Sequence, residues 1–205
     1  MLADEGPDAF YKGAIATAMA KDLHEGGSRI TVEDFAAYRP QVLTPLVHDH
    51  RGATLYTPSE TSGGQRLGEA LNFVTEHLDL SRPFGAHSYE IYAKALNQAF
   101  HNHDRRLGRL PETGSTSHMS AVDAEGNMVA LTYTLLNRFG SKVVLPSSGV
   151  LMNNAVSYFD PRPGYPTSMA GGKRINASNM CPMVCVRDDE AIFAVGASGA
   201  NQIVP

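Results

Sequence analysis

The sequence predicts an α+β fold in which a helical first half is followed by an antiparallel-sheet half. Up to about residue 108, apolar residues recur every three or four positions, as they do on amphipathic helices. After RLPETGS the pattern changes to alternation, and pairs of alternating runs flank short turn sequences, which is typical of hairpins. This change predicts two regions: residues 1–115, mostly helical, and residues 116–205, mostly strands.

The first half contains the expected helices in order. AFYKGAIATAMAKDLHEGG has apolar residues at helical spacing, and two glycines end it. In TVEDFAAY, Thr31 followed by Asp34 resembles a capping box, so a short helix is expected to begin there. GATLYTP predicts a strand and SETSGG a loop. Two further helices are expected at about 65–78 and 88–107.

The second half begins with HMSAVDAEGNMVALTYTLL, which predicts two strands joined by a turn at 123–127. SKVVLP and PMVCVRDDEAIFAVGASG continue the strand pattern, with a second hairpin turn at 187–190. These strands present more apolar surface than the remaining residues cover, and the chain ends abruptly at Pro205. We therefore expect the chain to be a fragment of a longer protein.

The composition is that of a globular protein, with 42% hydrophobic and 19% charged residues among 205. A net charge of -4 without a run of Lys or Arg argues against nucleic acid or an anionic membrane surface as partner. No apolar stretch approaches the roughly 20 residues that span a bilayer, and MLADEGPDAFYKG lacks the features of a signal peptide. We expect a soluble chain, with Cys181 and Cys185 as buried thiols.

A candidate nucleophile lies where a loop enters the first strand of the second half, in Gly114-Ser115-Thr116-Ser117-His118. A Thr hydroxyl needs an adjacent base, and the α-amine of the same residue can serve once the preceding peptide bond is cut. The pKa of such an amine is roughly 7.7 to 8.0, close to neutral pH. Taken alone, the pentapeptide is more typical of turn residues before a strand.

The surrounding sequence changes that interpretation. TSHMSAVDAEGNMVALTYTLLNRFGSKVVLPSSGVLMNN closely resembles the start of the small subunit of γ-glutamyltranspeptidases. Upstream, DAFYKGAIA, ITVEDFAAYRP, TPSETSGGQ and HDRRLG look like the last third of the large subunit of that family. Downstream, FDPRPGYP, GGKR, SNMCP and GASGANQI resemble its substrate-binding stretch. The resemblance covers nearly the whole chain and implies part of an αββα N-terminal-nucleophile sandwich.

The resemblance also implies catalytic roles. Thr116 matches the nucleophile, freed when the chain cuts itself between Ser115 and Thr116. Thr134 matches a Thr that hydrogen-bonds the nucleophile and assists self-cleavage, although a β-forming residue in a strand is the alternative. Gly199 and Ala200 match a Gly-Gly pair whose backbone N–H groups form the oxyanion hole, a role that Ala does not prevent.

Substrate-binding roles follow in the same way. Ser178 and Asn179 match the residues that hold the α-carboxylate of the substrate, with a polar loop as the alternative. The chain departs from the family where the α-ammonium is recognised: Leu136 replaces Asn, Ala155 replaces Gln and Tyr158 replaces Asp. Asn137 and Asp160 are nearby substitutes. Without a carboxylate at this place, a γ-glutamyl donor loses a contact of roughly 1.5 to 3 kcal/mol.

The implied function is that of a self-cleaving threonine acyltransferase/hydrolase. It would transfer a γ-glutamyl group from glutathione or a related amide to water, an amino acid or a peptide, without a metal or organic cofactor. Self-cleavage would leave a heterodimer of large and small subunits; relatives are often periplasmic or secreted. The alternatives are an inactive fragment or pseudoenzyme of the same fold, and an amidohydrolase relative with another acyl specificity.

Two more features bear on activity. The family usually has a few dozen more residues before the nucleophile than the stretch 109–115 provides here, and its carboxylate-clamping Arg lies upstream of Met1. We therefore expect the 205-residue chain alone to have little transferase activity. A serine-hydrolase mechanism is less supported, because no G-x-S-x-G motif occurs.

The histidines add no metal site to these expectations. His101 and His103 lie two apart on a predicted helix and face apart, and no third ligand accompanies Asp104, so surface or capping roles are expected. Strand alternation places His118 on the face of Thr116. It either orients the site or is structural.

Overall fold

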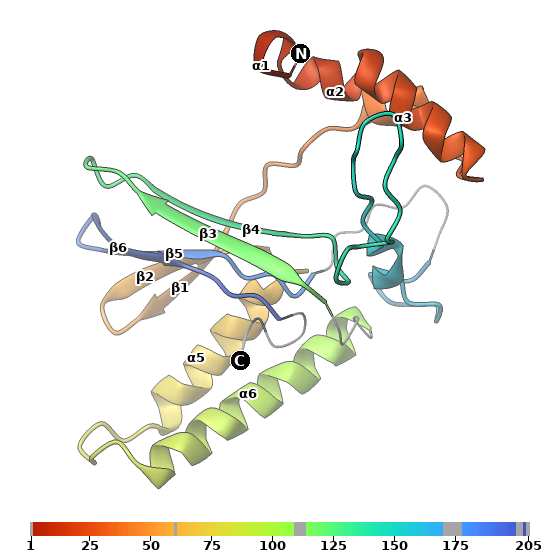
Figure 1. Cartoon of the computed structure of the whole chain (residues 1–205). Helices are drawn as coiled ribbons and strands as arrows, with labels where there is room; N and C mark the ends of the chain where they lie inside the picture. Colours follow the sequence, from red (N-terminus) through yellow and green to blue (C-terminus); the bar gives the residue numbers. More distant parts are fainter. Residues whose placement is uncertain (1, 60, 109–113, 170–177, 200–202, 204–205) are drawn as a thin grey trace. The chain divides into compact units, whose positions relative to one another are not determined.

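The computed structural model describes residues 2–59, 61–108, 114–169, 178–199 and 203 (Figure 1). The chain divides into two compact units, one of residues 1–42 and 139–153 and the other of residues 43–138 and 154–205. These units are defined by packing, whereas the predicted division at residue 115 is defined by the change from helical to strand patterns along the chain. That division stays a prediction.

The first unit begins with four helices, which are α1 (Leu2–Glu5), α2 (Pro7–Tyr11), α3 (Ala14–Glu25) and α4 (Val32–Ala37). The single helix expected from Ala9 onward is interrupted, because Gly13 caps α3 in an extended conformation. A Cβ at Gly13 would lie 3.0 Å from the Ala9 backbone. The capping box of α4 is confirmed: Thr31 N donates to Asp34 Oδ2 over 2.8 Å, and Asp34 N donates to Thr31 Oγ1 over 3.3 Å.

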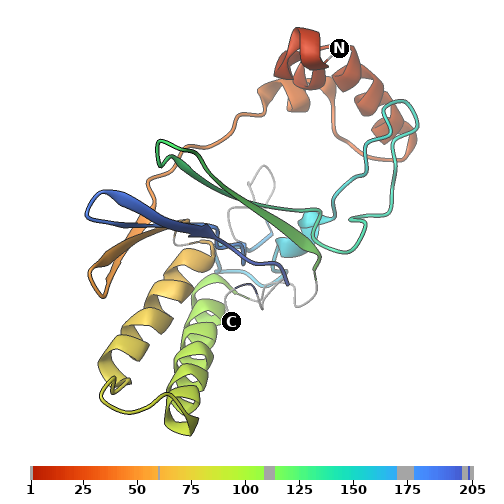
Figure 2. The ribbon, with the colours of Figure 1, turned by 60° about the vertical axis from the view of Figure 1, so that its left-hand side comes forward.

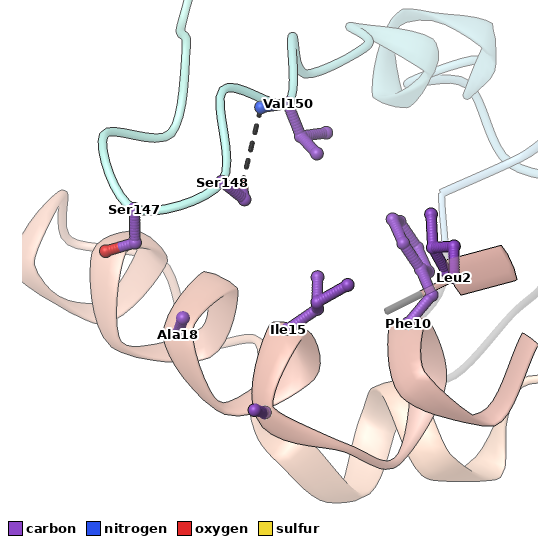
Figure 3. Close-up of a pocket in the computed structure, with 8 residues that line it drawn as sticks. Leu2, Phe10, Ile15, Ala18, Ser147, Ser148 and Val150 are labelled. Atoms are coloured by element: carbon purple, nitrogen blue, oxygen red, sulfur yellow. Dashed lines mark hydrogen bonds between the residues drawn. The ribbon is translucent and has the colours of Figure 1, made fainter. Parts of the chain in front are cut away.

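The segment 139–153 packs on these helices as a loop. The prediction of a strand in SKVVLP is wrong, because only an isolated bridge forms there, between Val144 and Leu151. Leu145 turns inward and is buried with Met19 and Leu23, and its carbonyl accepts from Gly149 N in a turn. Pro146 follows and has no N–H to extend a ladder. An apolar pocket lies beside this contact, lined by residues that include Phe10, Ile15, Ala18 and Val150 (Figure 3).

The second unit contains an antiparallel sheet of order β1-β2-β5-β6, formed by β1 (Leu46–His50), β2 (Ala53–Thr57), β5 (Met183–Arg187) and β6 (Glu190–Val195). A separate hairpin is formed by β3 (Thr116–Val122) and β4 (Met128–Thr134). Figures 1 and 2 show the hairpin on one side of the sheet and two long helices on the other. This three-layer arrangement confirms the α+β class and is part of an αββα sandwich.

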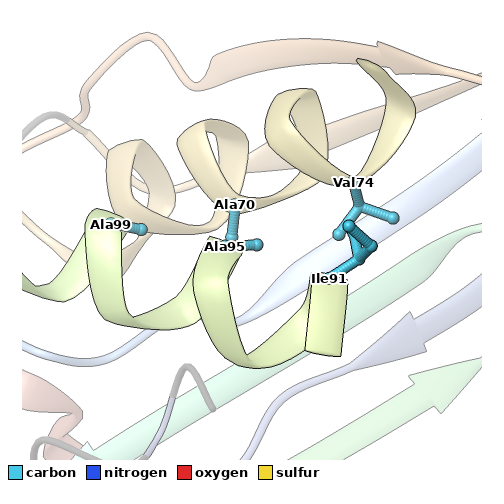
Figure 4. Close-up of a cluster of buried hydrophobic side chains, with 5 residues drawn as sticks. All are labelled: Ala70, Val74, Ile91, Ala95 and Ala99. Carbon is cyan, nitrogen blue, oxygen red and sulfur yellow. The ribbon is translucent and has the colours of Figure 1, made fainter. Parts of the chain in front are cut away.

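The two long helices are α5 (Gly63–His77) and α6 (Ala86–Leu107), as the sequence predicts. They pack through a cluster that is mostly alanine, which allows close approach of the two backbones (Figure 4). The cluster comprises Ala70, Val74, Ile91, Ala95 and Ala99. Glycine in α5 also allows the strands to pack closely against the helix, because a Cβ at Gly68 would collide with the ring of His48. The helix layer is thereby held against β1.

The sequence also bears on membrane-spanning helices and on the two cysteines. Among the described residues, no helix is both long and apolar enough to cross a membrane. Cys181 and Cys185 are buried and not disulfide-bonded, as expected of structural thiols. Burial raises the pKa of the Cys181 thiol to about 12.

Candidate active site

The predicted nucleophile is the first residue of β3. Thr116 lies directly opposite Thr134 in the β3–β4 register, and its side chain is half-buried. Residue Ser115 continues the pairing, because its N–H donates to the carbonyl of Leu136. The bond expected to be cut, between Ser115 and Thr116, is thus fixed at the end of a regular hairpin.

Three hydroxyl and carbonyl groups form a short chain at that bond. The Thr116 hydroxyl donates to Thr134 Oγ1 over 3.4 Å, and Thr134 donates to the carbonyl oxygen of Ser115 over 2.8 Å. The backbone N–H of Leu136 donates to Thr134 Oγ1 over 2.8 Å. Thr134 therefore has one donor that fixes its orientation, one that comes from the predicted nucleophile, and an acceptor on the bond to be cut.

Ser178 and Asn179 belong to a segment that contacts the residues just before α5. Ser178 N donates to the carbonyl of Thr61 over 2.9 Å, and its hydroxyl lies 3.4 Å from that of Ser62. Both side chains are buried, and Asn179 Nδ2 has no hydrogen-bond partner among the described residues. A buried amide N–H without a partner is costly in a native fold. Among the described residues Asn179 Nδ2 therefore lacks a partner, although the Asn179 side chain also hydrogen-bonds His103, and its binding role stays a prediction.

The predicted oxyanion residues follow β6. Gly199 has φ 130°, a backbone conformation that side chains rarely adopt, which explains glycine at this position. Ala200 lies outside the described residues. Only the first of the two proposed N–H donors can therefore be placed on the fold.

Asn137 and Asp160 were the substitutes predicted for recognition of the donor. Asn137 is exposed, and its N–H donates to Asn154 Oδ1 over 2.9 Å. Asp160 is buried and forms a bidentate pair with Arg162, with Nη2 2.6 Å from Oδ2 and Nε 3.0 Å from Oδ1. The carboxylate is therefore already engaged by a cation in this structure.

The three positions that depart from the family pattern come together. Leu136 and Tyr158 are buried in one hydrophobic cluster with Leu107, the last residue of α6, and Ala155 packs against it. Ala155 and Tyr158 belong to a short 3-10 helix, η1 (Ala155–Tyr158). Thr134, the last residue of β4, lies two positions before Leu136. A buried apolar cluster thus begins two residues along the chain from the Thr134 hydroxyl.

Sequence patterns did not identify His103 as buried. It lies on the face of α6 that is covered by α5 and by the segment 178–181. His103 is 1% exposed, so the expected surface or capping role was wrong. Burial and the guanidinium groups of Arg66 and Arg106 lower the pKa of His103 to about 4, while Asn179 and Glu69 act in the opposite direction. Within the described part of the chain, no group of three or more His, Cys, Asp or Glu residues could hold a metal ion.

Comparisons with known proteins point to one family, and the matches cover the whole chain. A family model described as Gamma-glutamyltranspeptidase matches residues 1–110 and 102–205. The Glutathione hydrolase proenzyme of Escherichia coli (strain K12) is 31% identical over 257 aligned residues, which cover 100% of this chain and 44% of the relative. The Acylase ACY 1 proenzyme of Pseudomonas sp. (strain SE83) is 29% identical over 244 residues, with coverage of 100% and 44%.

Among solved structures, cephalosporin acylase from Bacillus halodurans superimposes with a TM-score of 0.82 at 23% identity, covering 95% of this chain and 42% of that chain. At this identity the likeness shows the fold alone. The chain spans less than half the length of the curated relatives it matches. The family match is made in two pieces, which overlap at residues 102–110, next to the linker predicted to be short.

Proposed function

Because this chain belongs to the γ-glutamyltranspeptidase family, we propose that it is a self-cleaving acyltransferase/hydrolase whose nucleophile is Thr116. The observation that carries the proposal is the hydrogen-bonded chain from Thr116 through Thr134 to the carbonyl of Ser115. It supplies a route for the proton and a donor for the developing oxyanion at the bond to be cut. An ordinary hairpin start requires neither.

In self-cleavage, Thr116 Oγ1 attacks the carbonyl carbon of Ser115. Its proton passes to Thr134 Oγ1, and the proton of Thr134 passes to the former carbonyl oxygen of Ser115, so no free charge is left on the intermediate. Breaking the C–N bond transfers the acyl group to the Thr116 oxygen and a proton to its nitrogen. Water then hydrolyses this ester, leaving a carboxylate on Ser115 and a free amine on Thr116.

In acyl transfer, the freed α-amine of Thr116 takes the proton of its own hydroxyl as the oxygen attacks the amide carbon of the donor. The N–H groups of Gly199 and Ala200 would hold the oxyanion, at roughly 3 to 4 kcal/mol for a good donor. The leaving amine receives the proton, and an acyl-enzyme remains. Water, an amino acid or a peptide then accepts the acyl group, with Ser178 and Asn179 holding the α-carboxylate of a γ-glutamyl donor.

The sheet supports a stable heterodimer after cleavage. Strand β2 precedes the cut and β5 follows it, yet they pair with Leu55 opposite Cys185. The side chains of these two residues are buried together in one cluster. The hydroxyl of Thr167 also donates to the carbonyl of Leu107, which joins the end of α6 to the later segment. The two products would therefore remain associated without a covalent link.

The acyl donor has a second candidate class. The cluster of Leu136, Ala155 and Tyr158 with Leu107 places apolar groups where the family resemblance implies recognition of an α-ammonium. Placing a free ammonium against these buried apolar groups is unfavourable. This observation, together with the similarity to a protein named an acylase, favours a donor whose acyl group lacks the α-ammonium. Both classes share the nucleophile and the self-cleavage step.

Incubation of the purified chain followed by a denaturing gel tests the proposal. We expect two bands, the smaller reading TSHMSAVD by N-terminal sequencing, and a single band for Thr116→Ala. Thr116→Ser keeps a hydroxyl nucleophile and should still be cut. A single stable band for the wild-type chain, unaltered by Thr116→Ala, would instead identify a pseudoenzyme of the same fold.

A further inference from the structure

His118 is held on the same face of the hairpin as the nucleophile. Alternate residues of a strand share a face, so Thr116, His118 and Ser120 point the same way. The His118 ring is fixed at both nitrogens: Nδ1 lies 2.7 Å from Thr132 Oγ1, and Nε2 lies 2.8 Å from Ser120 Oγ. Thr132 is directly opposite His118 in the register. Because both nitrogens face these hydroxyls, the ring is not aimed at Thr116 as a base.

The Cε1 and Nδ1 atoms of this ring lie against the backbone that follows β6 in the four-stranded sheet. Strand β6 ends at Val195, and a Cβ added to Gly196 would collide with Cε1 and Nδ1 of His118, with Cγ at 3.0 Å. Gly196 is not among the residues with positive φ. Glycine is therefore required here for space and not for an unusual backbone conformation. The His118 ring defines how closely the backbone at Gly196 approaches the hairpin.

The residues after Gly196 lead directly to the predicted oxyanion donor. Ala197 packs against the cluster of Cys181 and Ile203, as Met180 does. Gly199 follows two residues later, and three residues span at most about 10 Å. The segment 196–199 is thus held between His118 and the segment that carries Asn179, with a short tether to the Gly199 amide.

We propose that His118 is a positioning residue, which sets the distance between segment 196–199 and the hydroxyl of Thr116 by packing on Gly196. The inference rests on the proposed function, because Gly199 and Thr116 act together only in acyl transfer. His118 contacts no reacting atom. Its effect is on the rate constant of acylation, since oxyanion donors work only at the correct distance from the attacked carbon.

The test is acylation of the self-cleaved protein by p-nitrophenyl acetate, a small ester that needs no glutamyl recognition. The Thr116 oxygen takes the acetyl group, and p-nitrophenolate is released in a burst. Burst amplitude counts correctly folded sites, whereas the burst rate constant reports their geometry. A purely structural defect lowers the amplitude and leaves the rate constant unchanged.

Gly196→Ala should lower the burst rate constant by about tenfold or more, since a displacement of 1 Å can cost up to about 100-fold. The double variant His118→Ala/Gly196→Ala should return to the rate constant of His118→Ala alone, because the smaller side chain makes room for the new methyl group. Gly85→Ala is the matched control, since a Cβ there meets only the Pro83 carbonyl at 3.9 Å. It should acylate at the wild-type rate.

The possible outcomes separate the two claims. A wild-type burst with Gly196→Ala at the wild-type rate overturns the positioning role alone. The positioning role is also overturned if the rate constant of the double variant falls by the product of the losses in the two single variants. Absence of a Thr116-dependent burst in the wild-type protein overturns the proposed function and the positioning role with it.

Discussion

The hydroxyl of Thr134 donates to the carbonyl oxygen of Ser115 over 2.8 Å, across the bond that joins Ser115 to the predicted nucleophile. Thr134 Oγ1 also accepts a hydrogen bond from the backbone N–H of Leu136, so the Thr134 hydroxyl proton is directed at the Ser115 carbonyl. This contact places a neutral donor where negative charge would develop during self-cleavage. Strand propensity alone does not account for this contact.

Thr134→Val should slow self-cleavage by about 100-fold, because the substitution keeps the shape of the side chain and removes the donor. The rate is measured from the fraction cut on denaturing gels over time. Thr134→Ser retains the hydroxyl and should be much less affected. Thr54→Val is the matched control, since Thr54 lies on β2 and bonds Asp49. Equal slowing in both Val variants would contradict a specific role for Thr134.

Gly108→Ala should destabilise the second unit more than a glycine substitution in a turn does. Gly108 has φ 85°, and an added Cβ would lie 2.8 Å from Asp160 Oδ2 and 3.0 Å from Thr167 Oγ1. Strain at positive φ costs about 1 to 2 kcal/mol, and crowding a well-packed site adds about 1 to 3 kcal/mol. Urea unfolding followed by far-UV circular dichroism measures the free energy of unfolding.

Gly126→Ala provides the comparison for this prediction. Its φ is 86°, but an added Cβ meets only that of Ala191, at 3.8 Å. The variant should therefore show the cost of positive φ alone. If both variants lose the same free energy of unfolding, Asp160 and Thr167 do not restrict the end of α6.

The buried histidine gives a pH dependence of stability. The pKa of His103 is lowered from 6.5 to about 4 in the folded chain, so the unfolded chain binds this proton at higher pH. Its neutral form therefore contributes stability that is fully present above pH 6.5 and is lost as the pH falls toward 4. The change is about 3 kcal/mol, at about 1.4 kcal/mol per pKa unit.

His103→Gln should remove this part of the pH dependence, as measured by urea unfolding between pH 4.5 and 8. The difference in slope is the readout, because loss of packing shifts the variant equally at every pH. His101→Gln, at an exposed position two residues away, should keep the wild-type slope. A His103→Gln slope equal to that of the wild type would place the titration elsewhere.

The burial of His103 illustrates what sequence reasoning can and cannot detect. A signal was present, because the buried residues of α6 recur every four positions at Ile91, Ala95, Ala99, His103 and Leu107. A single polar residue in such a series is usually assigned to the surface. The helix face at His103 is covered by Asn179, which lies far along the chain, and periodicity within one helix contains no information about such a neighbour.

Local patterns succeeded where local physics decides the structure. The capping box at Thr31, the two long helices and the β3–β4 hairpin all follow from their own residues. No strand forms in SKVVLP: Leu145 is buried with Met19 and Leu23 of α3, and only an isolated bridge forms there. The meeting of Leu136 with Tyr158 and Leu107 likewise depends on packing between distant segments.

Leu136→Asn tests whether that apolar cluster selects the acyl donor. Leu136 has φ 74°, a conformation in which Asn is enriched and Leu is unfavourable, so the backbone tolerates the exchange. Loss of the buried Leu side chain should still lower the free energy of unfolding by about 2 to 3 kcal/mol. The new amide would offer the α-ammonium of a γ-glutamyl donor a hydrogen-bond acceptor beside Thr134.

We expect kcat/KM for γ-glutamyl-p-nitroanilide to rise about tenfold relative to that for butyryl-p-nitroanilide, because one hydrogen bond to a charged group contributes about 1.5 to 3 kcal/mol. Both rates are expected to be low for the 205-residue chain alone, so the readout is their ratio. Both rates are measured on the self-cleaved protein, and their ratio cancels any loss of folded sites. Leu135→Asn is the control, with the same change at the preceding residue, outside the cluster. An equal shift in both variants, or none in either, would mean that the cluster formed by Leu136 does not choose between the donors.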